Sequence, residues 1–303
     1  MSALVVIPVA LPIAAAGASM LVGRSRRAQR LVSISALTVT TVCSLVLAWN
    51  VERDGPVAVA MGGWSPPLGI VLVADRLAAL MVAVASITLL AVLVYAIGQP
   101  GAERNHVGFQ SSYLVLSAGV SLSFLTGDLF NLFVAFEMML TASYVLITLG
   151  GTRDQVRTGM TYGLLTKGGV YALIRTQALL FAPEARPGAV ILWIAGLTMV
   201  IGVLGAIAQN DVKRILSFHI VSQIGYMVMG LGLFTVAGIA GAIFFIVHQV
   251  VVKTALFLTG GLVEHVGGSS RLDRIGNMVA TAPVLAVLFL VPALSLAGFP
   301  PLS

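Results

Sequence analysis

Three ionisable side chains stand inside apolar segments long enough to cross a bilayer: Glu137, Lys167 and Lys253. A charged side chain near the bilayer centre costs on the order of 3 kcal/mol or more, so such a residue usually faces a packed or hydrated interior. A lysine stem of about 6 Å covers less than half of the ~15 Å from midplane to headgroups, which argues against snorkelling. An acid and two amines at this depth suit a proton relay, because desolvation disfavours a charged lysine and a nearby carboxylate favours it.

Polar side chains recur at helical spacing around these charges and line single helix faces. Each has two interpretations, a hydrogen bond between neighbouring helices or a step in proton transfer. An imidazole changes its charge most readily near neutral pH, so the histidines fit either role. The residues concerned are Glu137 with Thr141, Tyr144 and Thr148, then His219 with Ser222, Gln223 and Tyr226, and finally His248 and Gln249 beside Lys253.

The composition excludes soluble classes of protein. Of 303 residues, 58% are apolar and only 9% are charged, whereas soluble domains carry about 25% charged residues. The formal net charge of +6 comes from short basic clusters between apolar runs, which indicates membrane topology signals and no nucleic-acid partner. A single cysteine, Cys43, provides no disulfide, thiolate metal cluster or haem attachment.

Motifs for enzymatic cofactors are missing from the sequence. It contains no GxxxxGK[ST] loop, no GxGxxG turn and no HxxxH pair. We therefore expect no cofactor, no metal site and no catalytic residues within this chain. The driving energy would come from ion gradients or from partner subunits, which predicts a secondary transporter component and not an enzyme.

The elements that position these residues are about ten predicted transmembrane helices, so the fold class is an all-α polytopic membrane helix bundle. Eleven basic residues fall in alternate loops, while the opposite loops hold only Arg53 and Arg186, with Arg76 at a span edge. This asymmetry places the N-terminus outside. The predicted spans are 3–22, 31–49, 72–97, 111–127, 129–149, 159–181, 189–208, 215–234, 237–262 and 279–298.

Long motifs in these spans resemble a known family. The chain is similar to the D-type subunit of the Mrp-type multisubunit sodium/proton antiporters, a family homologous to the antiporter-like membrane subunits of complex I. The resemblance extends over almost the whole chain. Its motifs are GDLFNLFVAFEMMLTASYVLITL at 127–149, LLTKGGVYALIR at 164–175, AIAQNDVKRILSFHIVSQIGYMVMGLG at 206–232, HQVVVKTALFLTGGLVEHVGG at 248–268 and PALSLAGFPPLS at 292–303.

The resemblance implies a proton pathway. Glu137 matches the family's essential glutamate, which is thought to gate proton entry between neighbouring subunits. Lys167 matches the relay lysine of the LLTK motif, and Lys253 matches a lysine further along the axis, with His248 beside it and His219 as a further candidate. Asp128, in the motif that holds Glu137, we interpret first as a helix cap.

The sequence departs from the family at two places. A broken helix with a GxKAAxFPLxxWLPDSYP-like segment is missing, as though about two spans were removed around 162–164, and the chain stops at Ser303 where relatives continue. We therefore expect an incomplete inverted-repeat, antiporter-like fold. One transmembrane domain, 1–303, would comprise N-terminal helices 1–110, a remnant of the first repeat at 111–181 and a partial second repeat at 189–303.

Three functions remain open. The first is a proton-translocating subunit of a monovalent cation (Na⁺)/proton antiporter complex, with other hydrophobic subunits as partners, in a prokaryotic plasma membrane. The second is an M- or N-like membrane subunit of a proton-pumping NADH:quinone oxidoreductase. The third is a truncated fragment that does not transport, because a half-channel without its broken helix has no evident hydrated route to Lys167.

Overall fold

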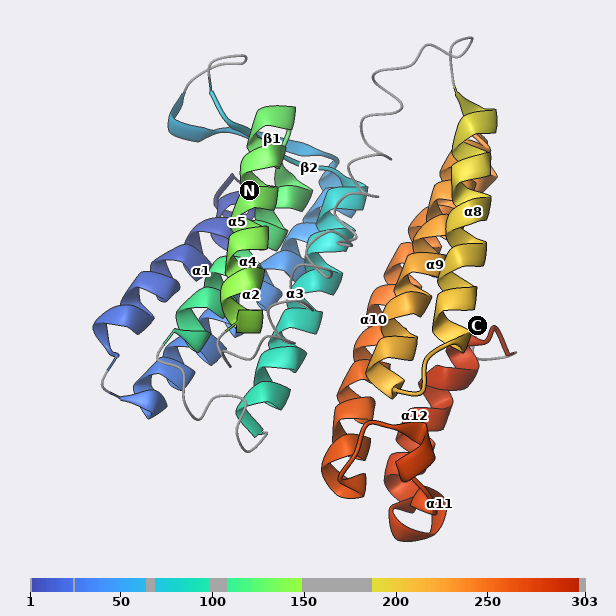
Figure 1. The fold of residues 1–303 in the computed structure, drawn as a ribbon. Helices are drawn as coiled ribbons and strands as arrows, with labels where there is room; N and C mark the ends of the chain where they lie inside the picture. Colours follow the sequence, from blue (N-terminus) through green and yellow to red (C-terminus); the bar gives the residue numbers. More distant parts are fainter. Residues whose placement is uncertain (1, 24, 64–68, 99–107, 149–186, 300–303) are drawn as a thin grey trace. The chain divides into compact units, whose positions relative to one another are not determined.

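The computed structural model describes residues 2–23, 25–63, 69–98, 108–148 and 187–299. These residues form two compact units, Met1–Gly168 and Gly169–Ser303. Almost all of their secondary structure is helical (Figure 1). The all-α, polytopic fold class is thereby confirmed, since long apolar helices follow one another along the chain. The proposed division at 110, 181 and 189 stays a prediction.

The N-terminal unit is built from five long helices within its described residues. Helix α1 contacts α2 and α4; α2 also contacts α3, and α4 also contacts α3 and α5. Alanine and leucine side chains fill the contact between α1, α2, α3 and α4, where the Tyr113 hydroxyl donates to the Leu89 carbonyl at 2.7 Å. The helices are α1 (Ser2–Leu21), α2 (Arg26–Asp54), α3 (Arg76–Gly98), α4 (Phe109–Leu125) and α5 (Leu129–Thr148).

A short hairpin lies between α2 and α3, at one end of these helices (Figure 1). Strands β1 (Val57–Ala60) and β2 (Val71–Ala74) pair antiparallel, with a 3-10 turn η1 (Met61–Gly63) after β1. The predicted span 72–97 was therefore wrong at its start, because its first residues form β2. Asp75 explains the boundary: its carboxylate accepts from the Ala78 backbone N–H at 2.8 Å and so caps α3.

In its described residues, 187–299, the C-terminal unit has three long helices followed by a shorter helical segment. Helix α9 packs against both α8 and α10, and α12 packs against α10 (Figure 1). The elements are α8 (Gly188–Ile207), α9 (Val212–Gly232), α10 (Val236–Gly267), η3 (Leu272–Arg274), α11 (Met278–Thr281) and α12 (Pro283–Leu296). Side chains define the starts of two helices: Asp211 accepts from the backbone N–H groups of Lys213 and Arg214 in α9, and Thr235 accepts from that of Gly238 in α10.

Two predicted spans of the C-terminal unit differ from the helices that form. The predicted span 279–298 is interrupted, because the four-residue helix α11 ends before α12 begins at Pro283. Proline has no backbone N–H and disfavours a helical residue before it, and Ala282 is accordingly not helical. Helix α10 continues past the predicted 262 to Gly267, because the helix carries on through Glu264 and His265 after the apolar run has ended.

Hydrophobicity and length support a membrane location. Within the described residues, six helices are long and apolar enough to span a bilayer, namely α1, α2, α3, α8, α9 and α10. Three shorter apolar stretches are 109–125, 129–143 and 283–296. Nine of the ten predicted spans thus correspond to helices in the described part of the chain, and the predicted span 159–181 lies outside it.

Candidate functional site

Lys253 is a buried amine in the middle of a membrane helix. It lies on α10, and only 3% of the residue is exposed. Its Nζ donates to the backbone carbonyl of Leu216 on α9 at 3.5 Å. That carbonyl belongs to the first turns of α9, which begin at the Asp211 cap. The sequence predicted the burial of Lys253 but not its backbone partner.

Several buried polar atoms have no hydrogen-bond partner on α10, which carries Lys253, and on α9, which packs against it. Gln249 lies one turn before Lys253 on α10, and the charge of Lys253 acts on His219 of α9. Buried polar atoms normally have a partner, and where the protein provides none a water molecule does. On α9 and α10, four buried side-chain atoms have no hydrogen-bond partner among the described residues: His219 Nδ1, Ser222 Oγ, Gln223 Oε1 and Gln249 Oε1. We call His219, Gln223 and Gln249 the α9–α10 polar cluster; Ser222 lies instead against Gly202 of α8. A water molecule bound to His219 or Gln249 would provide the hydrogen-bonded neighbour of the Lys253 amine that a proton-transfer step requires.

His248 lies on a different side of α10 from Lys253. Its Nε2 is 2.9 Å from the Ser295 hydroxyl of α12, and its ring stacks on Phe244 at a centroid distance of 6.2 Å. Five residues along a helix turn the direction of a side chain by about 140°. The structure therefore brings Lys253 together with His219 on the α9 side and places His248 on the α12 side. Ser295 was missed by the sequence analysis, because a lone serine in an apolar run carries no distinguishing signal.

Glu137 is exposed on the outward face of α5. The opposite face of α5 packs on α4, where a Cβ on Gly119 would lie 3.1 Å from the Met139 backbone nitrogen. Among the described residues Glu137 makes no hydrogen bond and no ion pair, and the exposed side chains of Phe130 and Phe133 share its helix. An unpaired carboxylate facing lipid would be neutralised. The exposure of Glu137 thus fits a surface that another protein segment covers.

The remaining predicted residues have separate outcomes. Lys167 lies outside the described residues. Thr141 is exposed on α5, and Tyr226 on α9 is also exposed and contacts the Phe245 ring of α10 at a centroid distance of 5.9 Å. The cap prediction for Asp128 is confirmed, because its carboxylate accepts from the backbone N–H of the third residue of α5 at 2.6 Å.

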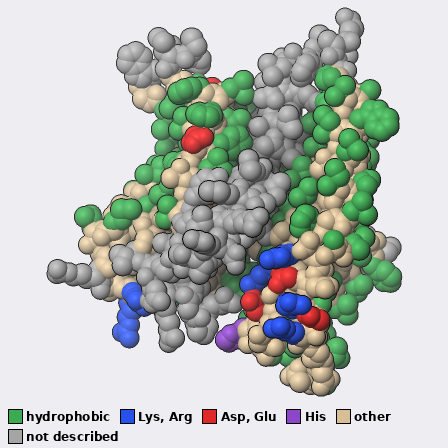
Figure 2. Space-filling view, viewed as in Figure 1, with side chains coloured by type: hydrophobic (Ala, Val, Ile, Leu, Met, Phe, Trp, Pro, Cys, Tyr) green, Lys and Arg blue, Asp and Glu red, His purple; other side chains and the backbone are tan. Residues whose placement is uncertain are grey.

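Charged side chains gather at the end of the C-terminal unit where α9 begins and α10 ends (Figure 2). Lys213 forms an ion pair with Glu264 between α9 and α10. Arg271 and Asp273 form an exposed pair at 2.7 Å. The hydrogen bond from Arg271 and its charge lower the pKa of the Asp273 carboxyl. No group of three His, Cys, Asp or Glu side chains suited to hold a metal ion occurs in the part of the chain that the structure describes.

Long apolar helices with a buried lysine, buried amides and a histidine between them define a class of multi-pass membrane proteins. In such proteins intramembrane ionisable groups mark ion pathways. Comparisons with known proteins identify the family within this class.

Residues 160–303 match the family described as "NADH:quinone oxidoreductase/Mrp antiporter, TM". The D-type subunit of the Na(+)/H(+) antiporter of Alkalihalophilus pseudofirmus is 37% identical over 389 aligned positions, which include all of this chain and 78% of the relative. The protein of the same name in Bacillus subtilis is 30% identical, again with all of this chain and 78% of the relative covered. In the solved Mrp complex from Dietzia sp., one chain superposes with a TM-score of 0.85 at 26% identity, covering 99% of this chain and 72% of that one.

The chain belongs to the family of D-type antiporter subunits, which share their membrane domain with NADH:quinone oxidoreductases. The 389 aligned positions exceed the 303 residues of this chain by 86. The Alkalihalophilus relative therefore has residues within the aligned region that have no counterpart here. The deletion expected around 162–164 stays a prediction.

Proposed function

We propose that this chain is a proton-translocating subunit of a monovalent cation (Na⁺)/proton antiporter complex in a prokaryotic plasma membrane. Its partners would be other hydrophobic membrane subunits. The relatives named for Na⁺/H⁺ antiport support this proposal, as does the superposition on one chain of a multisubunit Mrp complex. One structural observation carries it: the buried Lys253 amine beside the unsatisfied α9–α10 polar cluster.

Lys253 would hold and release a proton within the membrane. The Leu216 carbonyl accepts a hydrogen bond from the amine and steadies it. Water held by the free atoms of His219 and Gln249 would carry the proton to or from the amine, because proton transfer needs a hydrogen-bonded neighbour. A gradient supplies about 2.3 kcal/mol per charge for each 100 mV, enough to change the protonation of a coupled pair of groups.

Glu137, Lys167 and His248 would complete the pathway. Glu137 would face another subunit of the complex, since its helix face is open and apolar around the carboxylate. His248, held by Ser295, would be a station on the α12 side of α10. Lys167 keeps the relay role that the family resemblance implies. The relatives named for Na⁺/H⁺ antiport support a transporter component over an enzyme.

Lys253→Arg tests the central step. Arginine keeps the positive charge but does not deprotonate, so we expect Na⁺-dependent proton flux to be lost in inside-out vesicles that carry the complete complex with this chain in it. Lys213→Gln is the matched control, because Lys213 is an exposed lysine in a surface ion pair, and its flux should match that of the unmodified complex. Unchanged flux in Lys253→Arg would show that Lys253 is an electrostatic support and not a proton carrier.

Glu137→Gln tests the contact with another subunit. We expect flux to fall while the chain still assembles, because glutamine keeps the shape of the side chain but cannot ionise. Glu52→Gln is the control, since Glu52 is also exposed but pairs with Arg76 at the surface. Equal flux in both variants would remove Glu137 from the pathway.

Two other functions give different results in the same vesicles. A membrane component of an NADH:quinone oxidoreductase would support proton flux that depends on NADH and not on Na⁺. The match to a family that includes those enzymes keeps this alternative in view, whereas the names of the relatives favour the antiporter. A chain that only packs in the membrane would support neither flux, although it would still be inserted.

A further inference from the structure

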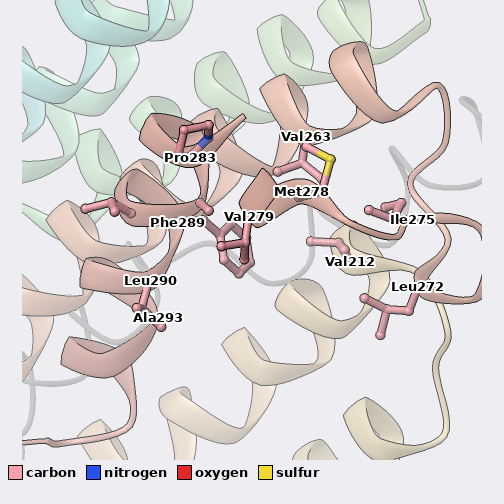
Figure 3. Close-up of a pocket in the computed structure, with 12 residues that line it drawn as sticks. Val212, Val263, Leu272, Ile275, Met278, Val279, Pro283, Phe289, Leu290 and Ala293 are labelled. Atoms are coloured by element: carbon pink, nitrogen blue, oxygen red, sulfur yellow. The ribbon is translucent and has the colours of Figure 1, made fainter. Parts of the chain in front are cut away.

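An apolar cavity of about 480 Å³ lies in the C-terminal unit, between the first residue of α9, the last turns of α10, and α11 with α12 (Figure 3). All twelve side chains that line it are apolar. Apolar contacts have little directional preference, whereas hydrogen bonds require a defined geometry. A set of such directional contacts joins α4 to α5 in the N-terminal unit.

The junction between α4 and α5, residues 126–128, is anchored to strand β2 of the hairpin. The Gly127 N–H donates to the Val71 carbonyl at 2.7 Å, and Thr126 forms an antiparallel bridge with Leu72. A Cβ on Gly127 would lie 2.9 Å from the Val71 carbonyl oxygen, so a side chain at this position would clash with the strand. The backbone of the junction is therefore held in place before α5 begins.

Thr126 and Asn131 connect this anchored junction to the first turn of α5. The Asn131 Nδ2 donates to the Thr126 hydroxyl at 2.9 Å, and that hydroxyl donates to the Asp128 carbonyl at 3.1 Å. The Asn131 backbone N–H donates to the Asp128 carboxylate at 2.6 Å. Only 3% of Asn131 is exposed, so its amide would lose a buried acceptor if the Thr126 hydroxyl were removed.

Asn131 belongs to the buried face of α5, and Glu137 lies on the exposed face. Six residues along a helix turn the direction of a side chain by about 240°. Because this angle is fixed by the helix, the direction of Asn131 determines the direction of Glu137. The buried residues of α5 all fall within about 100° of one another and include Met139, which lies against Gly119 of α4. They are Asn131, Leu132, Ala135, Met139 and Ala142.

We propose that Asn131 is a positioning residue for Glu137. The apolar contacts with α4 locate α5, and the hydrogen bond from the Asn131 amide to the Thr126 hydroxyl selects one rotation of the helix. That rotation turns the Glu137 carboxylate outward, where it can meet another subunit. This inference rests on the proposed function, because the proposed function gives Glu137 its step in the pathway. Asn131 itself does not carry the proton.

Thr126→Val tests the hydrogen bond, because it removes the hydroxyl and leaves a side chain of almost the same size. The buried Asn131 amide then loses its acceptor, so we expect Na⁺-dependent proton flux per assembled complex to fall at least about fivefold in vesicles with the complete complex. Asn131→Leu removes the donor and should have the same effect. Thr126→Ser keeps the hydroxyl and should keep the flux. Thr38→Val is the matched control with unchanged flux, because the exposed Thr38 hydroxyl donates within its own helix to the Ile34 carbonyl.

A crosslink reports the direction of position 137 independently of flux. A photoreactive phenylalanine in place of Glu137 should crosslink to another membrane subunit in the complete complex. Adding Thr126→Val should lower the yield of that crosslink at least about fivefold, because the same hydrogen bond is lost, whereas adding Thr126→Ser should leave the yield unchanged.

The positioning role and the proposed function fail in different ways. Equal crosslink yields or equal flux in Thr126→Val and Thr126→Ser would overturn the positioning role of Asn131. It would also be overturned if position 137 formed no crosslink to a subunit while Thr126 is intact. Unchanged flux in Glu137→Gln, with a crosslink that still depends on the Thr126 hydroxyl, would instead refute the step that the proposed function gives to Glu137.

Discussion

A very close approach between α8 and α9 makes Gly202 a sharp test of the C-terminal unit. A Cβ added to Gly202 would overlap the backbone nitrogen of Ser222, which is part of a helix and cannot move alone. Gly196 lies on the same helix, and a Cβ there would meet no atom within 4 Å. Gly202→Ala and Gly196→Ala therefore introduce the same methyl group into opposite environments.

The expected magnitude follows from this comparison. Both substitutions gain the same helix propensity, up to about 1 kcal/mol for glycine to alanine. Overpacking a close contact costs about 1–3 kcal/mol, and only Gly202→Ala incurs it. The difference between the two free energies of unfolding should therefore be about 1–3 kcal/mol, or roughly 5- to 150-fold in the unfolding equilibrium.

Reversible unfolding in bicelles by added dodecyl sulfate, followed by circular dichroism, measures that difference. Because α9 also carries His219 of the α9–α10 polar cluster, displacement of α9 should also lower proton flux in vesicles with Gly202→Ala. Equal stability of the two variants would refute the close α8–α9 packing. A more stable Gly202→Ala variant would show that the contact is loose enough to admit a methyl group.

Three further predictions concern charged residues. Asp128→Ala removes the cap of α5 and should lower the free energy of unfolding by about 0.5–2 kcal/mol in the same assay; no change would show that the cap is dispensable. The exposed Lys213–Glu264 pair should contribute at most about 1 kcal/mol and lose that contribution in high salt, so a large, salt-independent loss in Glu264→Gln would contradict it. Arg271 lowers the pKa of the Asp273 carboxyl, so the ionised carboxyl stabilises the folded chain above its ordinary pKa of 3.8, and this stabilisation is lost as the pH falls through the lowered pKa. The free energy of unfolding should therefore depend less on pH between about pH 5 and 2 in Asp273→Asn than in the unmodified chain. Identical pH profiles of the two would refute this.

Hydropathy predicted the helices because the bilayer forces each backbone to satisfy its own hydrogen bonds. It could not predict where a helix begins or ends once polar side chains decide the boundary. Asp75 starts α3 four residues later than the apolar run suggested, and Ser25 starts α2 before its apolar run. Proline chemistry alone predicts a helix break before Pro283, but the continuous apolar sequence around it led to the prediction of a single span.

The candidate site was predictable in residue type and only partly in geometry. A lysine in an apolar run is expensive wherever it points, so the burial of Lys253 followed from the sequence. Its partners did not, because the Leu216 carbonyl is 37 residues away and carries no side-chain signal. The sequence analysis placed His248 beside Lys253, but their five-residue spacing separates the two side chains round the helix, and the partner of His248, Ser295, lies 47 residues along the chain.

The structure also limits what this chain can do without partners. Proton transfer needs hydrogen-bonding neighbours, and Coulomb coupling between charges weakens with distance and with the surrounding dielectric. Lys253 has a carbonyl and the polar cluster around it, whereas Glu137 faces outward with no partner among the described residues. In the proposed pathway, the group that completes the Glu137 step would therefore come from another subunit or from residues such as Lys167. Substitution of Glu137 should consequently change proton flux only in the assembled complex. Substitution of Lys253 instead alters the packed interior of this chain itself.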